Sequence, residues 1–257
     1  MLKNISILFL VMCCTSCYGI EKFVITPIPK CGSHLLMKCI KRLTGREVIG
    51  FGDGTLEDFK THMVYAENNN GVMKIHFYSG DFASTLGKNG YKNIFMCRDP
   101  RDACVSLVFY LDSMKGNKRD FMWVCDEWDS LTFDEKLTSV IIGSFSVSYM
   151  EVWYERMIRW STYPNTLIVR YEDLVGPYAG GTQFMQHKTI REIANHIGVP
   201  YKEDIFLDVH YPRVSLNYWK RFFTNEHEEI LEARYGHILK KFGYDASCYE
   251  KFSIYYD

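Results

Sequence analysis

The sequence has almost no net charge, no Walker A pattern and no complete set of zinc-ligand cysteines. Its 30 Lys and Arg residues nearly balance 31 Asp and Glu residues, so no overall field draws the protein to nucleic acid. The missing Walker A pattern argues against a P-loop kinase. Cys14 and Cys17 have the spacing of a zinc pair, but no second pair completes four ligands. We therefore expect no nucleic-acid partner and no metal, and any anion site must be built locally.

Nine cysteines do not predict a disulfide scaffold in this chain. At 257 residues it is long enough to bury a sizeable core, unlike the small secreted domains that depend on disulfides. Cys39, Cys97 and Cys104 lie in apolar stretches, where a free cysteine packs as a small hydrophobic residue. We expect mostly free thiols in the core.

Residues 1–20 are similar to a secretory signal peptide. Lys3 precedes an apolar run over residues 5–12, and small or polar residues follow. The run is too short for a permanent membrane span, and we expect no stable span beyond it. We expect residues 1–20 to be a leader and residues 21–257 a single domain, with an extra strand or a later start as the alternatives.

The stretch from residue 23 to residue 40 predicts a strand, a tight loop and a helix. An apolar run ends in Pro27, Pro29 and Gly32, and helical periodicity follows from Ser33. Backbone N–H groups at a helix N-terminus have no internal acceptor, so an anion can bind there, and Lys30 and Ser33 add donors. An ordinary strand-to-helix turn would use the same residues.

The rest of the chain alternates between strand and helix patterns. We expect further strands at 72–77, 93–97 and 166–170, and helices at 33–42, 103–111, 137–160, 189–197 and 225–242. This alternation predicts an α/β fold with a mostly parallel central sheet and flanking helices.

Three segments have a less regular pattern. Residues 46–71 read as a connection with a short helix at 56–59, and residues 112–135 as a cap or lid. Gly143 is expected to lie inside the long helix at 137–160.

Polar side chains follow several of the predicted strands. Lys30, His76, Arg98 and Tyr171 all fall just beyond a strand end, where ligands bind in parallel sheets. Lys74 shares a strand face with His76. Taken singly, these residues could equally be a core histidine, a solvated lysine and an arginine paired with Asp102 along its helix.

Five motifs in order resemble the sulfotransferases that use 3′-phosphoadenosine 5′-phosphosulfate (PAPS). Residues 26–35 (TPIPKCGSHL) are similar to the family's phosphosulfate loop, and residues 74–76 (KIH) to its lysine–histidine segment. Residues 97–106 (CRDPRDACVS), 170–174 (RYEDL) and 219–224 (WKRFFT) are similar to its later nucleotide-binding segments. The resemblance implies a P-loop-nucleotide-hydrolase-like sulfotransferase fold.

The resemblance also implies a reaction and a set of site residues. A sulfuryl group would pass from PAPS to a hydroxyl or amine of a small-molecule or glycan acceptor, leaving 3′-phosphoadenosine 5′-phosphate (PAP), without a metal. His76 would be the general base, and Lys30 and Lys74 would stabilise charge. The cofactor-binding residues implied are Lys30, Cys31, Gly32, Ser33, His34, Arg98, Ser106, Tyr171 and Arg213.

The chain departs from the family pattern at several positions. Cys31 replaces a serine, Leu35 replaces the adenine-stacking tryptophan, and His34 replaces a phosphate-binding threonine. The late loop, residues 212–220, retains Arg213 as its candidate cation. A catalytically silent nucleotide-binding descendant is therefore the main alternative, and a P-loop nucleotide kinase a weaker one. The leader suggests export or membrane anchoring, whereas the supply of PAPS favours the cytoplasm, and both locations stay open.

Overall fold

The centre of the protein is a five-stranded sheet in which every neighbouring pair is parallel. The structure is a computed structural model that describes residues 20–52, 54–114, 126–143, 150–205, 207 and 215–244. The strand order is β2-β3-β1-β4-β5. The strands are β1 (Phe23–Pro27), β2 (Val48–Phe51), β3 (Val72–Ile75), β4 (Lys92–Cys97) and β5 (Thr166–Arg170).

The burial of each strand follows from its place in the sheet. All residues of the central strand β1 are buried, whereas the outer strands β2 and β5 each have one buried residue and are otherwise partly or fully exposed. A parallel sheet needs cover on both faces, which is why its inner strands are mostly apolar. The register places Pro27 beside Met96 and Cys97 beside Arg170.

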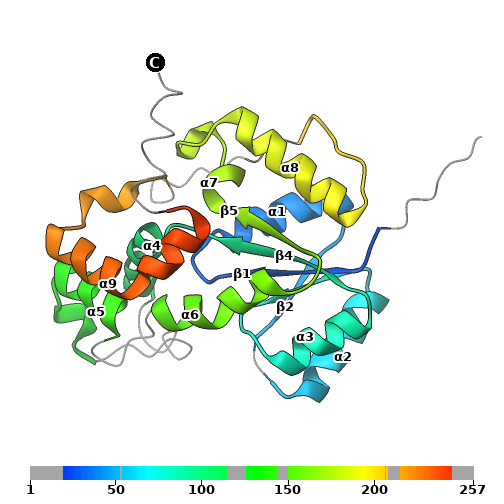
Figure 1. Cartoon of the computed structure of the whole chain (residues 1–257), viewed down its shortest axis with the longest axis horizontal. Coiled ribbons are helices and arrows are strands. Elements are labelled where there is room, and N and C mark those ends of the chain that lie inside the picture. The colour runs from blue at the N-terminus through cyan, green and yellow to red at the C-terminus, as the bar shows by residue number, and fades with distance from the viewer. Residues whose placement is uncertain are drawn as a thin grey trace, which may run out of the picture.

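Helices follow each strand and cover both faces of the sheet (Figure 1). The α-helices are α1 (Ser33–Thr44), α2 (Leu56–Asn68), α3 (Gly80–Lys88), α4 (Pro100–Ser113), α5 (Phe133–Ile142), α6 (Met150–Met157), α7 (Tyr171–Leu174), α8 (Gln183–Ile197) and α9 (Asn225–Phe242). Short 3₁₀ helices span Asp126–Ser130, Ile158–Thr162, Pro177–Ala179 and Tyr218–Arg221.

Two apolar clusters form the core, one on each face of the sheet. On one face, residues of α1 and α8 such as Leu36 and Ile193 pack against Ile25. On the other face, residues of α2, α3 and α6 pack against strand residues such as Phe95. Helices α4, α5 and α9 gather beyond the carboxyl ends of the strands (Figure 1). These clusters confirm the α/β fold predicted from the alternating pattern.

Residues 46–71 are more ordered than the sequence predicted. They hold strand β2 and the whole of helix α2, whereas we expected a connection with a helix only at 56–59. Strand β2 has four residues, one of them Gly50, so its apolar pattern is too brief to recognise. The start of α2 did carry a signal, because Thr55 and Asp58 form a reciprocal capping box.

The prediction of one helix over 137–160 is wrong. Helix α5 begins earlier, at Phe133, and ends at Gly143, whose φ of 77° is left-handed. Helix α6 follows from Met150, and a 3₁₀ helix begins at Ile158. Glycine at this position ends the helix because it adopts the left-handed conformation without a steric penalty.

Part of the segment predicted as a cap belongs to the core. Trp128 is fully buried, and its indole N–H donates a hydrogen bond to Asp112 Oδ1 at 2.9 Å. Its environment comes from elements distant in the sequence, so the local pattern did not reveal it. Residues 115–125 lie outside the described part of the chain.

Several sequence predictions can be compared with the structure only in part. Of the predicted leader, residues 1–19 lie outside the described residues, as does Arg213. No helix in the described part of the chain has both the length and the apolar character needed to cross a bilayer. The four cysteines resolved as free thiols are all buried, as expected for Cys39, Cys97 and Cys104, and the fourth is Cys31.

Candidate active site

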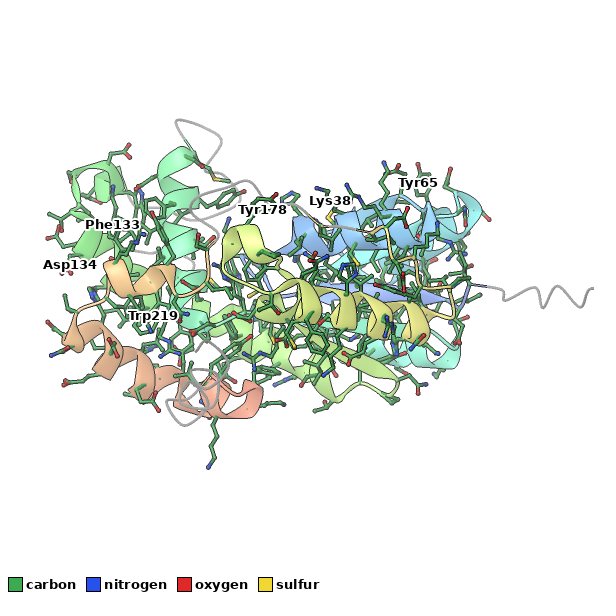
Figure 2. The ribbon with its side chains drawn as sticks, turned by 90° about the horizontal axis from the view of Figure 1, so that it is seen from above. Lys38, Tyr65, Phe133, Asp134, Tyr178 and Trp219 are labelled. Carbon is green, nitrogen blue, oxygen red and sulfur yellow. The ribbon has the colours of Figure 1, made fainter. Side chains whose placement is uncertain are left out.

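Four neighbouring strands bring the predicted site residues to one edge of the sheet. In the order β3-β1-β4-β5, the strands end at His76, the loop that holds Lys30, Arg98 and Tyr171. Because all the strands are parallel, their carboxyl ends meet at this edge. Figure 2 shows Trp219, from the late loop, and Phe133 at this end of the molecule, with Tyr65 at the other.

The loop after β1 presents backbone donors. The Ile28 N–H donates to the Met96 carbonyl at 2.9 Å, and the Cys31 N–H donates to the Ile28 carbonyl at 3.1 Å. Lys30 and Gly32 have positive φ values of 65° and 91°. The first bond of α1 runs from the Leu36 N–H to the Gly32 carbonyl, so the preceding N–H groups have no acceptor within the helix. N–H groups without an acceptor at a helix N-terminus can bind an anion.

Lys30 lies in this loop, and its side chain is partly buried. Its Nζ lies 3.7 Å from the ring centroid of Tyr110 on α4. Burial and the positive charge of Arg98 lower the pKa of Lys30 to about 8. Two cations close enough to repel each other mark a place where an anion would be stabilised.

His76 is a neutral imidazole with one defined tautomer. Its Nδ1 lies 3.0 Å from the Pro27 carbonyl oxygen, which can only accept, so Nδ1 carries the hydrogen and Nε2 has a free lone pair. Burial, and then the charge of Lys74, lower the pKa of His76 to about 4. The side chain can therefore accept a proton at neutral pH.

Lys74 lies on β3, two residues before His76. Its partly buried side chain lies beside Gly50 of β2, since a Cβ added at Gly50 would lie 3.7 Å from Lys74 Cε. Burial lowers the pKa of Lys74. The structure thus brings Lys74 and His76 together, as their spacing predicted.

Arg98 is almost completely buried, with 2% of its surface exposed. Its guanidinium carbon lies 4.4 Å from the ring centroid of Tyr171, and its Nη2 lies 3.8 Å from Asp102 Oδ2. The ion pair with Asp102, one of the ordinary interpretations of the sequence, is present. Ser106 is partly buried two turns along α4.

Gly32 and Tyr171 are in close contact. A Cβ added at Gly32 would lie 2.4 Å from a Tyr171 ring carbon, so only glycine fits beneath this ring. The guanidinium of Arg98 also packs against this ring. Tyr171 therefore joins the loop after β1 to the arginine after β4.

Asp102 anchors the late loop, a role that the sequence did not reveal. Its carboxylate accepts the backbone N–H groups of Asn217 at 3.0 Å and Trp219 at 2.9 Å. Among the described residues, Trp219 Nε1 is buried without a hydrogen-bond partner. The only sequence signal for Asp102 was its place four residues after Arg98, which predicted a local ion pair.

Cys31, one of the predicted cofactor-binding residues, has its side chain in the core, as does Leu35, which replaces the family's stacking tryptophan. The Cys31 side chain is fully buried, and its Sγ lies 3.3 Å from the Tyr154 hydroxyl. Leu35 is 6% exposed and packs in the core cluster of α1 and α8. Ser33 is partly buried and His34 exposed at the start of α1. Tyr154 and Tyr110 were missed because no local pattern marks them.

Within the described residues, no group of three or more His, Cys, Asp or Glu side chains is arranged to hold a metal ion.

Comparisons with known proteins agree with the fold. A mouse sulfotransferase, SULT7A1, solved in complex with PAP, superposes with a TM-score of 0.58 at 15% identity, over 86% of this chain and 88% of that one. A sulfotransferase from Alicyclobacillus acidocaldarius gives 0.46 at 18% identity, over 83% of this chain and 94% of that one. A search of curated protein sequences finds no match.

The family comparison covers most of the sequence. The profile described as "Sulfotransferase domain" matches residues 20–242, which include each of the five motifs at the strand ends and in the late loop. The chain therefore belongs to the sulfotransferase family, whose reaction is the transfer of a sulfuryl group.

Proposed function

We propose that the protein transfers a sulfuryl group from PAPS to a hydroxyl or amine of a small-molecule or glycan acceptor, with PAP as the other product. The observation that carries this proposal is a neutral His76 with a free Nε2, one strand away from the cationic loop of Lys30. A proton acceptor beside an anion site is what sulfuryl transfer to a hydroxyl needs.

The residues at the strand ends fit a nucleotide with two separate anionic groups. The N–H groups at the start of α1 and the Lys30 ammonium would hold the 5′-phosphosulfate. Arg98 after β4, with Ser106 and Arg213, would hold the 3′-phosphate, and Tyr171 would lie near the adenine. Leu35 is buried, so it supplies no stacking surface to replace the family's tryptophan.

Each catalytic residue has a distinct task in this proposal. When bound, PAPS supplies an activated sulfuryl group and a phosphate leaving group. His76 Nε2 takes the proton of the acceptor, while Nδ1 stays bonded to the Pro27 carbonyl and keeps the ring oriented. Lys30 stabilises the negative charge that develops on the leaving oxygen, and Lys74 is a second cation at the sulfonate. Most of the catalytic effect is alignment and charge stabilisation, as in phosphoryl transfer.

An apolar acceptor would find aromatic side chains beside His76. Phe77 follows it directly and packs edge-on against Phe82, with ring centroids 5.1 Å apart. Phe51, at the end of β2, lies 5.7 Å from Phe77 by the same measure. Phe51 and Phe82 are buried in the core, and the partly buried Phe77 is the ring of the three that could contact an acceptor with an apolar body.

The direct test incubates the purified protein with ³⁵S-labelled PAPS and a panel of phenols, alcohols, amines and oligosaccharides. We expect label on at least one acceptor. PAP binding without transfer to any acceptor would instead support the silent nucleotide-binding descendant. Transfer of labelled phosphate from ATP would support the kinase.

The pH dependence of kcat/KM for PAPS should show an alkaline decline above about pH 8. Lys30 is charged below its pKa of about 8 and loses that charge above it, so the leaving oxygen is then less stabilised. His76, with a pKa of about 4, stays neutral throughout this range and does not cause the decline. The measurement is initial rate against pH at low PAPS concentration, with circular dichroism to confirm folding at each pH.

A Lys30→Arg variant is the control for this profile. Arginine does not titrate in this range, so the alkaline decline should vanish even where the remaining activity is low. An unchanged decline in the variant would assign it to another group.

A further inference from the structure

A buried chain of polar contacts links the two halves of the candidate nucleotide site. The hydroxyl of Tyr154, on α6, donates to the Arg98 carbonyl oxygen at 2.5 Å. The same hydroxyl lies 3.3 Å from Cys31 Sγ. All three residues are almost wholly buried, so water does not compete for these contacts. Helix α6 lies on the same side of the sheet as α3, below the ends of β1 and β4 (Figure 1).

The direction of these hydrogen bonds is fixed by the groups involved. A carbonyl oxygen only accepts, so the single phenolic proton points to Arg98. The Tyr154 oxygen is then the acceptor for the thiol of Cys31. Burial raises the pKa of Cys31 to about 12, so the sulfur keeps its proton and can donate it. The chain therefore runs from the Cys31 S–H through the Tyr154 O–H to the Arg98 carbonyl.

The two ends of this chain of hydrogen bonds lie next to the residues that would bind the nucleotide. Cys31 stands between Lys30 and Gly32 in the loop after β1. Arg98 is the first residue after β4, and its side chain is the candidate for the 3′-phosphate. Tyr154 thus spans two separate strand ends from a third element. Its ring has no exposed surface from which to contact a ligand directly.

We propose that Tyr154 is a positioning residue that fixes the spacing between the loop after β1 and Arg98, and so sets the affinity for nucleotides that carry both a 5′- and a 3′-phosphate. This inference rests on the proposed function, because it takes the two strand ends to be the two phosphate sites. Removing the hydroxyl leaves a buried thiol and a buried carbonyl without their partner, and both segments can then shift.

The test compares the binding of PAP and of AMP, which lacks the 3′-phosphate, by isothermal titration calorimetry. In Tyr154→Phe we expect PAP to bind at least about fivefold more weakly, and AMP to lose less, because AMP does not bridge the two segments. The ratio of the AMP dissociation constant to the PAP dissociation constant should therefore fall. A purely structural role would weaken both ligands equally.

Tyr235→Phe is the matched control. Tyr235 is also fully buried in the same core cluster, and its hydroxyl donates to the Ile141 carbonyl at 3.2 Å. Its ring packs edge-on against the Tyr154 ring, a contact that Tyr235→Phe keeps. We expect a comparable loss of thermal stability and an unchanged ratio of PAP to AMP affinity.

A second pair of variants keeps the test valid even where Tyr154→Phe folds poorly. Cys31→Ser keeps a donor for the Tyr154 oxygen, so it should weaken PAP binding less than Cys31→Ala does.

The outcomes separate this inference from the proposed function. Natural protein that fails to bind PAP would overturn both. PAP binding by the natural protein, with the same PAP to AMP ratio in Tyr154→Phe and Tyr235→Phe, would overturn the positioning role alone. Equal PAP affinity in Cys31→Ser and Cys31→Ala would do the same.

Discussion

Replacing His76 with alanine should lower kcat by about 10²–10⁴-fold, the usual contribution of a positioned general base. The variant loses the Nε2 acceptor that, in the proposed mechanism, takes the proton from the attacking hydroxyl. Affinity for PAP should change little, because His76 follows β3 and the nucleotide groups follow β1 and β4. The measurement is ³⁵S transfer at saturating PAPS and acceptor, together with PAP binding by calorimetry.

Two further variants show whether the base or the local structure is responsible. His76→Asn can still donate an N–H toward the Pro27 carbonyl but has no basic nitrogen, so its kcat should fall as far as that of the alanine variant. His187→Ala removes a partly buried histidine that bonds Tyr201 in the α8 region, and it should leave kcat unchanged. Near-normal turnover in His76→Asn would show that orientation of the loop, rather than proton transfer, is what His76 provides.

Replacing Gly32 with alanine should abolish measurable PAP binding and destabilise the fold. The left-handed backbone at φ 91° costs a non-glycine residue about 1–3 kcal/mol. The new Cβ would also lie 2.4 Å from the Tyr171 ring, and overpacking of this kind adds about 1–3 kcal/mol. Displacement of Tyr171 removes the ring on which Arg98 stacks, so both proposed phosphate sites are affected. Thermal unfolding and PAP titration measure the two effects.

Gly90→Ala separates the backbone cost from the steric one. Gly90 has a positive φ of 71°, but a Cβ there would meet nothing within 4 Å. It lies in the turn before β4, at the opposite edge of the sheet from the site. This variant should lose only the backbone contribution and keep its PAP affinity. Retained PAP binding in Gly32→Ala would mean that Tyr171 moves aside freely and that the close contact is unimportant.

Much of the fold follows from local patterns in the sequence. Strands β1, β3, β4 and β5 are apolar runs closed by a breaker or a polar residue, and each was predicted close to its observed bounds. Strand β2 was missed because four residues carry too little pattern. The break at Gly143 was missed because helical periodicity continues on both sides of it, and sequence alone does not show whether a glycine is tolerated or left-handed.

The candidate site was predictable where residues follow strands. Lys30, His76 and Arg98 could be placed together because parallel strands share one carboxyl edge. Their supporting contacts could not be predicted, since Tyr154, Tyr110 and Asp102 act through elements far apart in the chain. Cys31 illustrates the limit: its position in the loop suggested a phosphate contact, whereas the side chain turns inward to Tyr154.

The central position of β1 has a consequence for how the chain folds. Val24 pairs with Met73 on one side and with Asn93 on the other. The first strand of the described chain therefore completes its hydrogen bonding only when two later strands pair with it. Such distant pairings form slowly, because a long loop must close before any contact is gained. During synthesis, β1 and its loop should stay unpaired until β3 and β4 have left the ribosome. A nascent chain that stops before β4 would expose one edge of β1, and an unpaired strand edge promotes chaperone binding or aggregation.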